Sequence, residues 1–509
     1  MENRPLNNEE SESDDLKEEE IQINYTNFSP SIYQKTIDLL KYYCLCNECL
    51  GRQFSYLGTA TSNFERAHAI LLGITMECHL LLSKTTFQER YMLYNQNPIE
   101  ILDLLVKRTN FIPAKKIIDQ FKDNEVLFST LSNSSEKDEF NCQLCDNILL
   151  PKNINEICKS IDLKTRDYDF SDFLIGTHLN AVQADKEDEL RAKFNLKNGE
   201  SFKANLNRLI GKDLQGLWKK QPKYDQPGLM ITIDLEIKGK KDINLRSLPL
   251  YFKGRYKKWV RDLPQTHWHC FECRGKGFNK FTKKICPECG GTGDKYPSSI
   301  HDLIGNEFIK VTKGEEALFH GAGREDIDAR CIGSGRSFII EIRNPKIRNV
   351  DLIKIAQILN EENKTKIFVD SLLSATKKDI VEIKRSSEFL RKNYNALVYF
   401  AQPISKNEFN DKLQKAEEIL NDKIINQRTP LRVVHRRSDK TRKKKIHKIT
   451  GKYVDSRHGF FKINSQGGTY IKELIHGDNG RTNPSFSKIF GYPMLCVELD
   501  VVEIEESKQ

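Results

Sequence analysis

One short stretch of the chain brings acidic and basic side chains together with glycines, directly before an apolar segment. It covers residues 320–345 and reads HGAGREDIDARCIGSGRSFIIEIRNP. If GREDIDAR is extended, its side chains alternate between two faces, and Arg324, Asp326, Asp328 and Arg330 share one of them. An arginine keeps a neighbouring carboxyl ionised by lowering its pKa, and a positioned carboxylate can act as a nucleophile. From this segment alone, a surface ladder of ion pairs remains the favoured interpretation.

Cysteine is the second residue type that could do chemistry here. Eight of the thirteen cysteines form four C-x-x-C pairs, and each pair can direct two sulfurs at one metal ion. Two pairs are separated by 12 residues in a glycine-rich stretch, which predicts a zinc ribbon or knuckle. The other two pairs are separated by 92 residues, so one ion would join distant parts of an N-terminal domain. The predicted ligands are Cys46, Cys49, Cys142 and Cys145 in one cluster and Cys270, Cys273, Cys286 and Cys289 in the other.

The glycine-rich cysteine stretch, residues 267–293, also resembles the C-x-x-C-x-G-x-G units of DnaJ-type chaperones. That family needs four such units and a J domain, and neither is found in this sequence. The stretch is therefore interpreted as a basic zinc module inserted into a larger domain. Its lysines, which could contact phosphate groups, are Lys276, Lys280, Lys283 and Lys284.

Composition limits the class of protein. Lys and Arg number 81 and Asp and Glu 71, so the formal net charge is +10, and the acidic start of the chain hides part of the excess. A basic body indicates a polyanionic partner such as nucleic acid. There is no apolar run long enough to span a bilayer and no signal-peptide pattern. We expect an intracellular, cytoplasmic protein without a membrane partner, and nothing in the sequence requires more than a monomer.

Periodicity predicts the elements that must position these residues. Residues 1–23 lack aromatic side chains and are rich in acids, which predicts a disordered tail. Apolar residues at helical spacing predict helices, and alternating or continuous apolar runs predict strands. The predicted helices are 64–84, 199–214 and 407–421, and the predicted strands are 228–237, 337–342, 396–404, 431–437 and 494–505. The mixture predicts an α+β fold, with one domain over 24–250 and a second over 251–509.

Several long motifs together resemble one family. The stretch at 320–345 contains G-R-x-D before an apolar strand, as in pseudouridine synthases. KNYNALVYF, QRTPLRVVHRR and GGTYIKELIHGDNGRTNPS follow it, and CNECLGRQF and FKGRYKKWVRDLPQT precede it. Their order and spacing are similar to those of the tRNA pseudouridine(54/55) synthases of archaea and eukaryotes, from about residue 40 to residue 505. The chain departs from that family mainly in its acidic tail and in the length of its cysteine insert.

The resemblance implies an enzyme that isomerises uridine in the TΨC arm of tRNA, at position 54, 55 or both, with no organic cofactor and about two structural zinc ions. It implies a mixed or antiparallel-sheet synthase domain with the zinc insert, and an N-terminal zinc-containing THUMP-type α/β domain that binds RNA. By the family's motif Asp326 is the nucleophile, and Arg324 helps to turn the nucleotide out of its stack. Tyr394 stacks on the flipped base, and Tyr470 and Lys472 contact the substrate or the catalytic carboxylate.

Three further expectations complete the sequence interpretation. Asp328 is expected to be structural and paired with Arg330, and Tyr470 and Lys472 are expected two residues apart on one face of a strand. Tyr256 and Trp259, among cations in GRYKKWV, could stack on unpaired nucleotides. The alternative function is a catalytically inactive, zinc-stapled RNA-binding protein that serves as a chaperone or processing partner.

Overall fold

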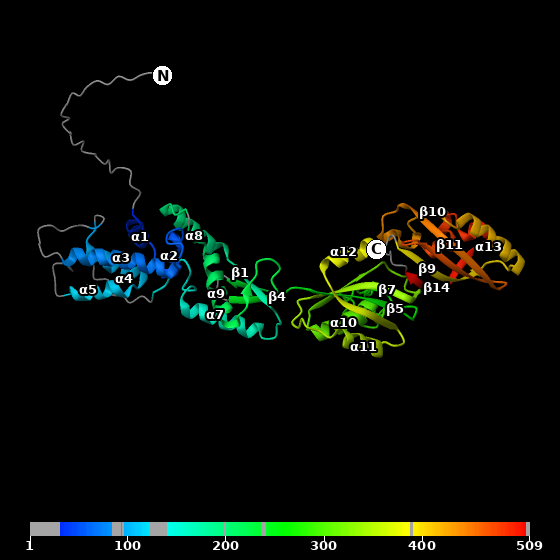
Figure 1. Cartoon of the computed structure of the whole chain (residues 1–509), viewed down its shortest axis with the longest axis horizontal. Helices are drawn as coiled ribbons and strands as arrows, with labels where there is room; N and C mark the ends of the chain where they lie inside the picture. Colours follow the sequence, from blue (N-terminus) through cyan, green and yellow to red (C-terminus); the bar gives the residue numbers. More distant parts are fainter. Residues whose placement is uncertain are drawn as a thin grey trace, which may run out of the picture. The chain divides into compact units, whose positions relative to one another are not determined.

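The computed structural model describes residues 31–83, 93, 96–122, 140–197, 199–235, 241–386 and 390–504. The predicted acidic tail, 1–23, lies outside the described residues. Helices and two mixed sheets alternate along the chain (Figure 1), which confirms the α+β class. Among the described residues, no helix is long and apolar enough to cross a membrane.

The chain divides into two compact units. The first contains the described residues up to Glu156 and those of Leu179–Leu209, and the second contains Ile157–His178, Ile210–Leu235 and the described residues after 240. The boundaries that the sequence predicts, 24–250 and 251–509, stay predictions. Two long helices, α7 and α9, contribute residues to both units.

The first unit is helical in its described part. Its longest helix, α3, follows the predicted 64–84 helix almost residue for residue and buries Leu71, Ile74 and Cys78. The helices of this part of the chain are α1 (Ile32–Leu40), α2 (Asn47–Gly51), the short η2 (Arg52–Phe54), α3 (Asn63–Ser83), α4 (Pro98–Thr109), α5 (Ile112–Gln120), α7 (Pro151–Thr165), α8 (Ala181–Phe194) and α9 (Phe202–Trp218).

A small four-stranded sheet opens the second unit, in the order β2-β1-β3-β4. β1 (Asp172–His178) runs parallel to β2 (Gln221–Pro222) and β3 (Leu229–Leu235), and β3 pairs antiparallel with β4 (Lys241–Ser247). The burial of β3 alternates residue by residue, as expected for a strand with one face in the core.

The remaining strands form a large mixed sheet in the order β13-β10-β11-β12-β9-β14-β7-β5-β8, with β6 added beside β7. The strands are β5 (Leu250–Lys258), β6 (Glu316–Gly321), β7 (Arg330–Arg343), β8 (Ile367–Ala375), β9 (Arg391–Phe400), β10 (Lys423–Arg428), β11 (Thr441–Asp455), β12 (His458–Gln466), β13 (Thr482–Asn483) and β14 (Met494–Ile504). The helices are α10 (Ile300–Thr312), α11 (Leu352–Glu362), α12 (Lys377–Ser386), α13 (Lys406–Leu420), α14 (Ile471–His476) and α15 (Phe486–Phe490), with η3 (Leu431–Arg436) and η4 (Asp478–Gly480).

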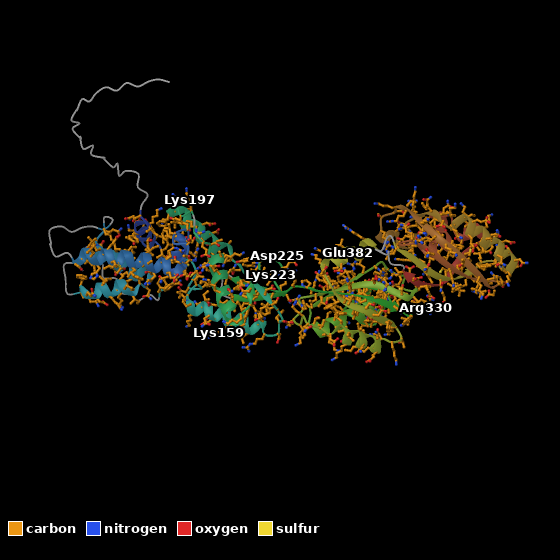
Figure 2. All side chains as sticks on the ribbon, in the orientation of Figure 1. Lys159, Lys197, Lys223, Asp225, Arg330 and Glu382 are labelled. Carbon is orange, nitrogen blue, oxygen red and sulfur yellow. The ribbon has the colours of Figure 1, made fainter. Side chains whose placement is uncertain are left out.

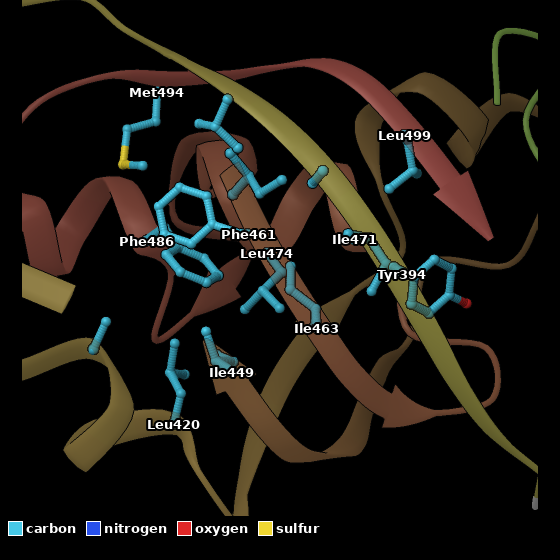
Figure 3. Packing of buried hydrophobic residues seen from close by; sticks show 14 of the residues in the cluster. Tyr394, Leu420, Ile449, Phe461, Ile463, Ile471, Leu474, Phe486, Met494 and Leu499 are labelled. Atoms are coloured by element: carbon cyan, nitrogen blue, oxygen red, sulfur yellow. The ribbon is translucent and has the colours of Figure 1, made fainter. Parts of the chain in front are cut away.

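This sheet has two halves, each with its own core. α10 and α11 lie together beside β5 and β7 (Figure 1), and Phe252, Phe308 and Ile340 are buried among them. α13, α14 and α15 belong to the other half, whose core has an aromatic centre that includes Phe461 and Phe486 (Figure 3). β14 joins the halves, because it pairs with β9 along most of its length on one side and with β7 on the other.

The structure overturns two of the element predictions. Residues 431–437 are not a strand: Pro430 caps a 3-10 helix there, η3. GREDIDAR is not extended either, because the Ala329 N–H donates to the Asp326 carbonyl at 3.0 Å and closes a tight turn. The helices predicted at 199–214 and 407–421 and the strands predicted at 228–237, 337–342, 396–404 and 494–505 are found. Residues 236, 237 and 505, at the ends of two of these predicted strands, lie outside the described residues.

Candidate active site

The candidate site is built around residues 322–329, which connect β6 to β7 and are called the acidic loop below. β7 begins at Arg330, and this is the point at which the two halves of the sheet meet (Figure 2). There β14 pairs in parallel with β7 through two residue pairs, Asp500 with Arg330 and Val501 with Cys331. The acidic loop therefore lies where side chains from both halves can reach it.

Glycine is required at the start of the acidic loop. Gly323 has a φ of +83°, a conformation that other residues rarely adopt. A Cβ at this position would also lie 3.1 Å from Arg336 Nη1 and 3.2 Å from Lys392 Nζ. The glycine in the motif thus lets the backbone approach two buried cations that stand beneath the loop.

Glu325, directly before Asp326, is buried, whereas Asp326 and Asp328 are partly or fully exposed. The Glu325 carboxylate lies 2.7 Å from Arg336 Nε and accepts hydrogen bonds from the Tyr256 hydroxyl at 2.8 and 3.0 Å. Gln265 Nε2 donates to the Tyr256 oxygen at 2.8 Å and to the Gly323 carbonyl at 3.0 Å. All of these side chains are buried, so the predicted nucleotide-stacking role of Tyr256 is wrong, and this tyrosine supports the loop from below.

Lys258 holds the turn of the acidic loop from the end of β5. Its buried ammonium donates to the carbonyls of Leu263 and Ile327, each at 2.9 Å, and to that of Asp326 at 3.3 Å. Burial lowers the pKa of Lys258, while the charge of Glu325 opposes that effect. The three carbonyls replace the water that the ammonium loses, and the position of Asp326 is fixed through its own backbone.

Asp326 is bound by an arginine that sequence reasoning missed. Arg432, in η3, donates through Nη1 to Asp326 Oδ1 at 2.8 Å and through Nη2 to Oδ2 at 3.1 Å. The same guanidinium donates through Nε to the buried carboxylate of Glu473 in α14 at 2.7 Å. Although burial opposes it, the bond to Glu473 and the charge of Asp326 raise the pKa of Arg432 above its ordinary value. Such a two-point fork fixes both the charge and the plane of a carboxylate.

Lys472 stands beside both outer acids of the loop. Its Nζ lies 2.5 Å from Asp328 and 3.9 Å from Asp326, and this contact lowers the pKa of Asp328 against the effect of burial. The predicted pair between Asp328 and Arg330 is wrong. Arg330 instead binds Asp500 of β14, at 2.9 and 2.6 Å, because the two residues are paired directly across β7 and β14.

Tyr394 lies on β9 and belongs to the apolar core next to the site. Figure 3 shows its ring near Ile471 and Leu499, with the hydroxyl directed away from the aromatic centre of the core. Burial raises the pKa of Tyr394 to about 12, so the phenol keeps its proton at neutral pH. It can offer a flat face and a hydrogen-bond donor to a ligand.

The two remaining predicted residues lie at the edges of the site. Tyr470 does not share a strand with Lys472; it caps the N-terminus of α14, and its hydroxyl accepts a hydrogen bond from Arg437 at 3.0 Å. Arg324 lies over the ring of Trp268, 5.2 Å from its centre, in a cation–π contact. Described contacts therefore join Asp326 to Lys472 and Arg432, whereas Tyr470 and Arg324 contact neighbours of the site.

Lys392 is a further residue that the sequence did not single out. It precedes Tyr394 by two positions on β9, so both side chains point to the same face of the sheet. Only 5% of Lys392 is exposed, and its ammonium lies against the acidic loop at Gly323. Burial, together with the charge of Arg336, lowers the pKa of Lys392 to about 7.

This burial has a measurable cost, and Lys392→Met is expected to remove it. The folded pKa lies below that of an unfolded lysine, about 10.4, so the cost is present in full below pH 7 and disappears as the pH rises toward 10. The melting temperature should rise at pH 6, by about 2–4 °C for each kcal/mol gained, and by less at pH 9. Lys462→Met, at an exposed position of β12, is the matched control and should leave the melting temperature unchanged. An equal rise at both pH values would contradict the assignment.

The predicted cysteines assemble into two clusters of four. In each cluster the four sulfurs lie within 4.8 Å of one another, which suits four thiolates around one metal ion. Cys46 caps α2 and Cys49 lies inside it, and the Cys46 and Cys145 sulfurs are 3.7 Å apart. In the second cluster, Gly277 and Gly293 donate backbone N–H groups to the Cys273 and Cys289 sulfurs at 3.2 Å. Burial raises the pKa of Cys289, but hydrogen bonds from the backbone amides of Gly293 and Gly291 outweigh this effect and lower the pKa to about 6. The lowered pKa favours the thiolate form, which binds metal.

Comparison with known proteins identifies the family of the chain. The family model described as Pus10, C-terminal, matches residues 251–505, and the one described as Pus10 THUMP domain, archaeal, matches residues 157–234. A tRNA pseudouridine synthase Pus10 of Methanocaldococcus jannaschii is 37% identical over 471 residues, which are 92% of this chain and 94% of the relative. The Pus10 of Thermofilum pendens is 33% identical, with 92% of this chain and 94% of the relative covered.

Among solved structures, a crystal structure of a Cbf5-Nop10-Gar1 complex matches weakly. The TM-score is 0.24 at 17% identity, and the match covers 40% of this chain and 45% of that one. Similarity at this level carries no argument about function. The assignment to a family therefore rests on the relatives and on the family models.

Proposed function

Because the chain belongs to the Pus10 family of tRNA pseudouridine synthases, we propose that it isomerises uridine to pseudouridine in the TΨC arm of tRNA, at position 54, 55 or both. The family makes the chain an isomerase with a tRNA substrate. The position in the tRNA and the roles of individual residues are the proposal. The observation that carries it is the pair of hydrogen bonds from Arg432 to Asp326 in a loop that glycines, Glu325 and Lys258 hold in place.

The reaction breaks the N1–C1′ bond of uridine, turns the uracil and joins C5 to C1′, while C5 loses a proton and N1 gains one. It neither oxidises the substrate nor adds atoms to it, so no organic cofactor is required. Asp326 supplies the nucleophilic carboxylate, and Arg432 keeps it ionised and correctly oriented. Lys472, bridging Asp328 and Asp326, provides additional positive charge where the substrate backbone would approach.

Tyr394 provides the stacking surface for the displaced base. Its ring belongs to the buried core and its hydroxyl is directed away from the aromatic centre of that core, so the ring is held rigidly before the substrate arrives. A phenol with a pKa of about 12 is a hydrogen-bond donor and not a base at neutral pH. We therefore assign Tyr394 to holding the base and not to removing its C5 proton.

The target nucleotide must leave its stack before a carboxylate can reach its sugar. Arg324 is placed two residues before Asp326, on the outer side of the loop, and helps to hold the nucleotide in the flipped position. Tyr470 and its partner Arg437 lie next to η3 and contact the substrate from that side.

Lys392 lies beneath the acidic loop. The Lys392→Met variant should therefore turn over tRNA more slowly than wild type, although the substitution stabilises the fold.

The direct test is a modification map of tRNA. Unmodified tRNA transcript is incubated with the protein, treated with carbodiimide and read by primer extension. New stops at uridine 54, uridine 55 or both are expected, and omission of the enzyme is the control. Tight tRNA binding without any new stop, across several tRNA substrates, would favour the inactive RNA-binding alternative.

The four-cysteine clusters are assigned to zinc. Four thiolates in a tetrahedral arrangement are a common set for structural zinc, and neither cluster leaves a position for a substrate. The residues that would hold the ions are the eight predicted cysteines. Zinc would stabilise the local fold there and take no part in the isomerisation.

Elemental analysis of the purified chain is expected to give about two zinc ions. Replacing Cys46 and Cys142 by Ser should remove one ion, and replacing Cys273 and Cys289 should remove the other. Because ligand binding and folding are coupled, each loss should also make the corresponding region sensitive to proteolysis. Cys496→Ser, outside both clusters, should keep both ions. A wild-type content of one ion or none would contradict the assignment.

A further inference from the structure

The cysteine module, residues 267–296, is built in an unusual way. Its buried side chains are almost entirely thiols: the only residues of its hydrophobic cluster are the four cysteines. Its large apolar side chains stay outside, with Phe281 89%, Phe271 70% and Ile285 70% exposed. Since the buried cluster of the module consists of the four cysteines, these exposed apolar side chains are not needed for its core.

Phe281 stands at the tip of an ordered hairpin. The Asn279 N–H donates to the Lys284 carbonyl at 2.9 Å, and the Lys283 N–H donates back to the Asn279 carbonyl at 3.0 Å. The Asn279 side chain accepts from the N–H of Phe281 at 2.9 Å. A bridge between Phe278 and Ile285 closes the base of the hairpin. The exposure of Phe281 is therefore fixed by its backbone and is not a property of a loose loop.

A second set of rings leads from the module to the acidic loop. Trp268 contacts Phe271 edge to face, with ring centres 6.1 Å apart, and Arg324 of the acidic loop lies over Trp268. Lys295 Nζ lies 4.9 Å from the centre of the Phe271 ring. His267, at the base of the module, contacts Asp302 of α10 at 3.1 Å. This contact fixes the module to the half of the large sheet that contains α10.

Charge indicates the kind of partner. Residues 274–285 contain one arginine and four lysines and no acidic residue, and all five cations are exposed. Binding of an apolar polypeptide would require a continuous hydrophobic surface. Here the exposed rings alternate with cations instead, and Lys283 Nζ lies 5.6 Å from the centre of the Phe278 ring. Aromatic faces among cations are what unpaired nucleotides require, since bases stack on the rings and phosphates meet the cations.

We propose that the cysteine module is a second tRNA contact, in which Phe271 and Phe281 stack on unpaired nucleotides while Lys280, Lys283 and Lys284 neutralise neighbouring phosphates. This proposal rests on the proposed function in one respect, namely that the RNA is tRNA. Through Trp268 and Arg324 it joins the loop that carries Asp326, so tRNA held by the module is held beside the active site.

The test measures the Kd of the full-length protein for an unmodified tRNA transcript at fixed salt. The double variant Phe271→Ala, Phe281→Ala should bind at least about ten-fold more weakly, because each stacked base contributes substantially. Double replacement by Leu should weaken binding similarly, and double replacement by Trp should keep it within about two-fold. Ile353→Ala, which removes an equally exposed side chain from α11, is the control.

The outcomes separate the alternatives. An unchanged Kd in the Ala variant, with zinc content and melting temperature retained, overturns the proposal. Leu variants that bind tRNA as well as wild type also overturn it. If, in that case, the wild-type protein suppresses aggregation of an unfolded protein and the Ala variant does not, the surface binds polypeptides. Failure of the proposed function would look different: the Kd would respond as expected, yet wild type would leave no mark on tRNA.

Discussion

Asp326→Asn is expected to lower the rate of pseudouridine formation by at least about four orders of magnitude, the range seen when an enzyme loses its nucleophile. Asparagine keeps the shape of the side chain but removes its negative charge, and an amide oxygen is a poor nucleophile. The tRNA affinity should change little, because Asp326 contributes no positive charge to phosphate binding. Single-turnover assays with carbodiimide mapping measure the rate, and binding is measured separately.

A matched control for this variant is present in the same loop. Asp328→Asn removes an equal charge two residues away, and Asp328 contacts Lys472 but has no fork from Arg432. It should retain most of the activity. If Asp326→Asn marked tRNA as well as wild type, the assignment of the nucleophile would be wrong, and if both variants failed equally, the loop would act only through its net charge.

Arg432→Met should have the second-largest effect. It removes both hydrogen bonds to Asp326, and we expect the rate to fall by about 10²–10³, the usual loss for a charge-stabilising donor in an active site. It also leaves the Glu473 carboxylate, whose side chain is 1% exposed, without its cation. An unpaired buried charge is costly, so unfolding should become easier by about 1–3 kcal/mol. Thermal melting and single-turnover rates measure the two effects.

A second substitution separates stability from catalysis. Adding Glu473→Gln to Arg432→Met removes the unpaired charge, so stability should largely return while the rate stays low. Arg432→Lys should recover only part of the rate, because lysine has no fork. Arg428→Met, which breaks an exposed ion pair with Asp439 nearby, is the control and should change neither quantity much. Recovery of the rate in the double variant would show that Arg432 serves only the fold.

The sequence could predict which residues carry chemistry better than it could predict what holds them. Cysteine spacing identified both clusters of four, because two thiolates on one turn need few residues and little context. Asp326 and Tyr394 were singled out through the family's motifs, and their roles stay predictions. Arg432 was missed, although it lies in a quoted motif, because an apolar run around it was taken for a strand. Only the tertiary structure shows that Pro430 starts a short helix there and turns the guanidinium to Asp326.

The buried side chains that support the acidic loop, Glu325, Tyr256 and Arg336, could not be predicted from the sequence for a different reason. Glu325 was not singled out from the sequence, and periodicity gives no partner for a buried acid. Its partners Tyr256 and Arg336 come from β5 and β7, whose register is set by long-range pairing. One signal was available: Tyr256 and Lys258 are two residues apart in β5, so both share a face of the strand with the apolar Phe252.

The position of β14 has a consequence for how an active enzyme first arises on the ribosome. Asp326 belongs to one half of the large sheet and Arg432 to the other, and the strand that joins them follows every other described strand in the chain. A nascent polypeptide that still lacks β14 can complete neither the seam nor the alignment of acid and arginine across it. We therefore expect synthase activity to appear only when translation of the domain is essentially finished.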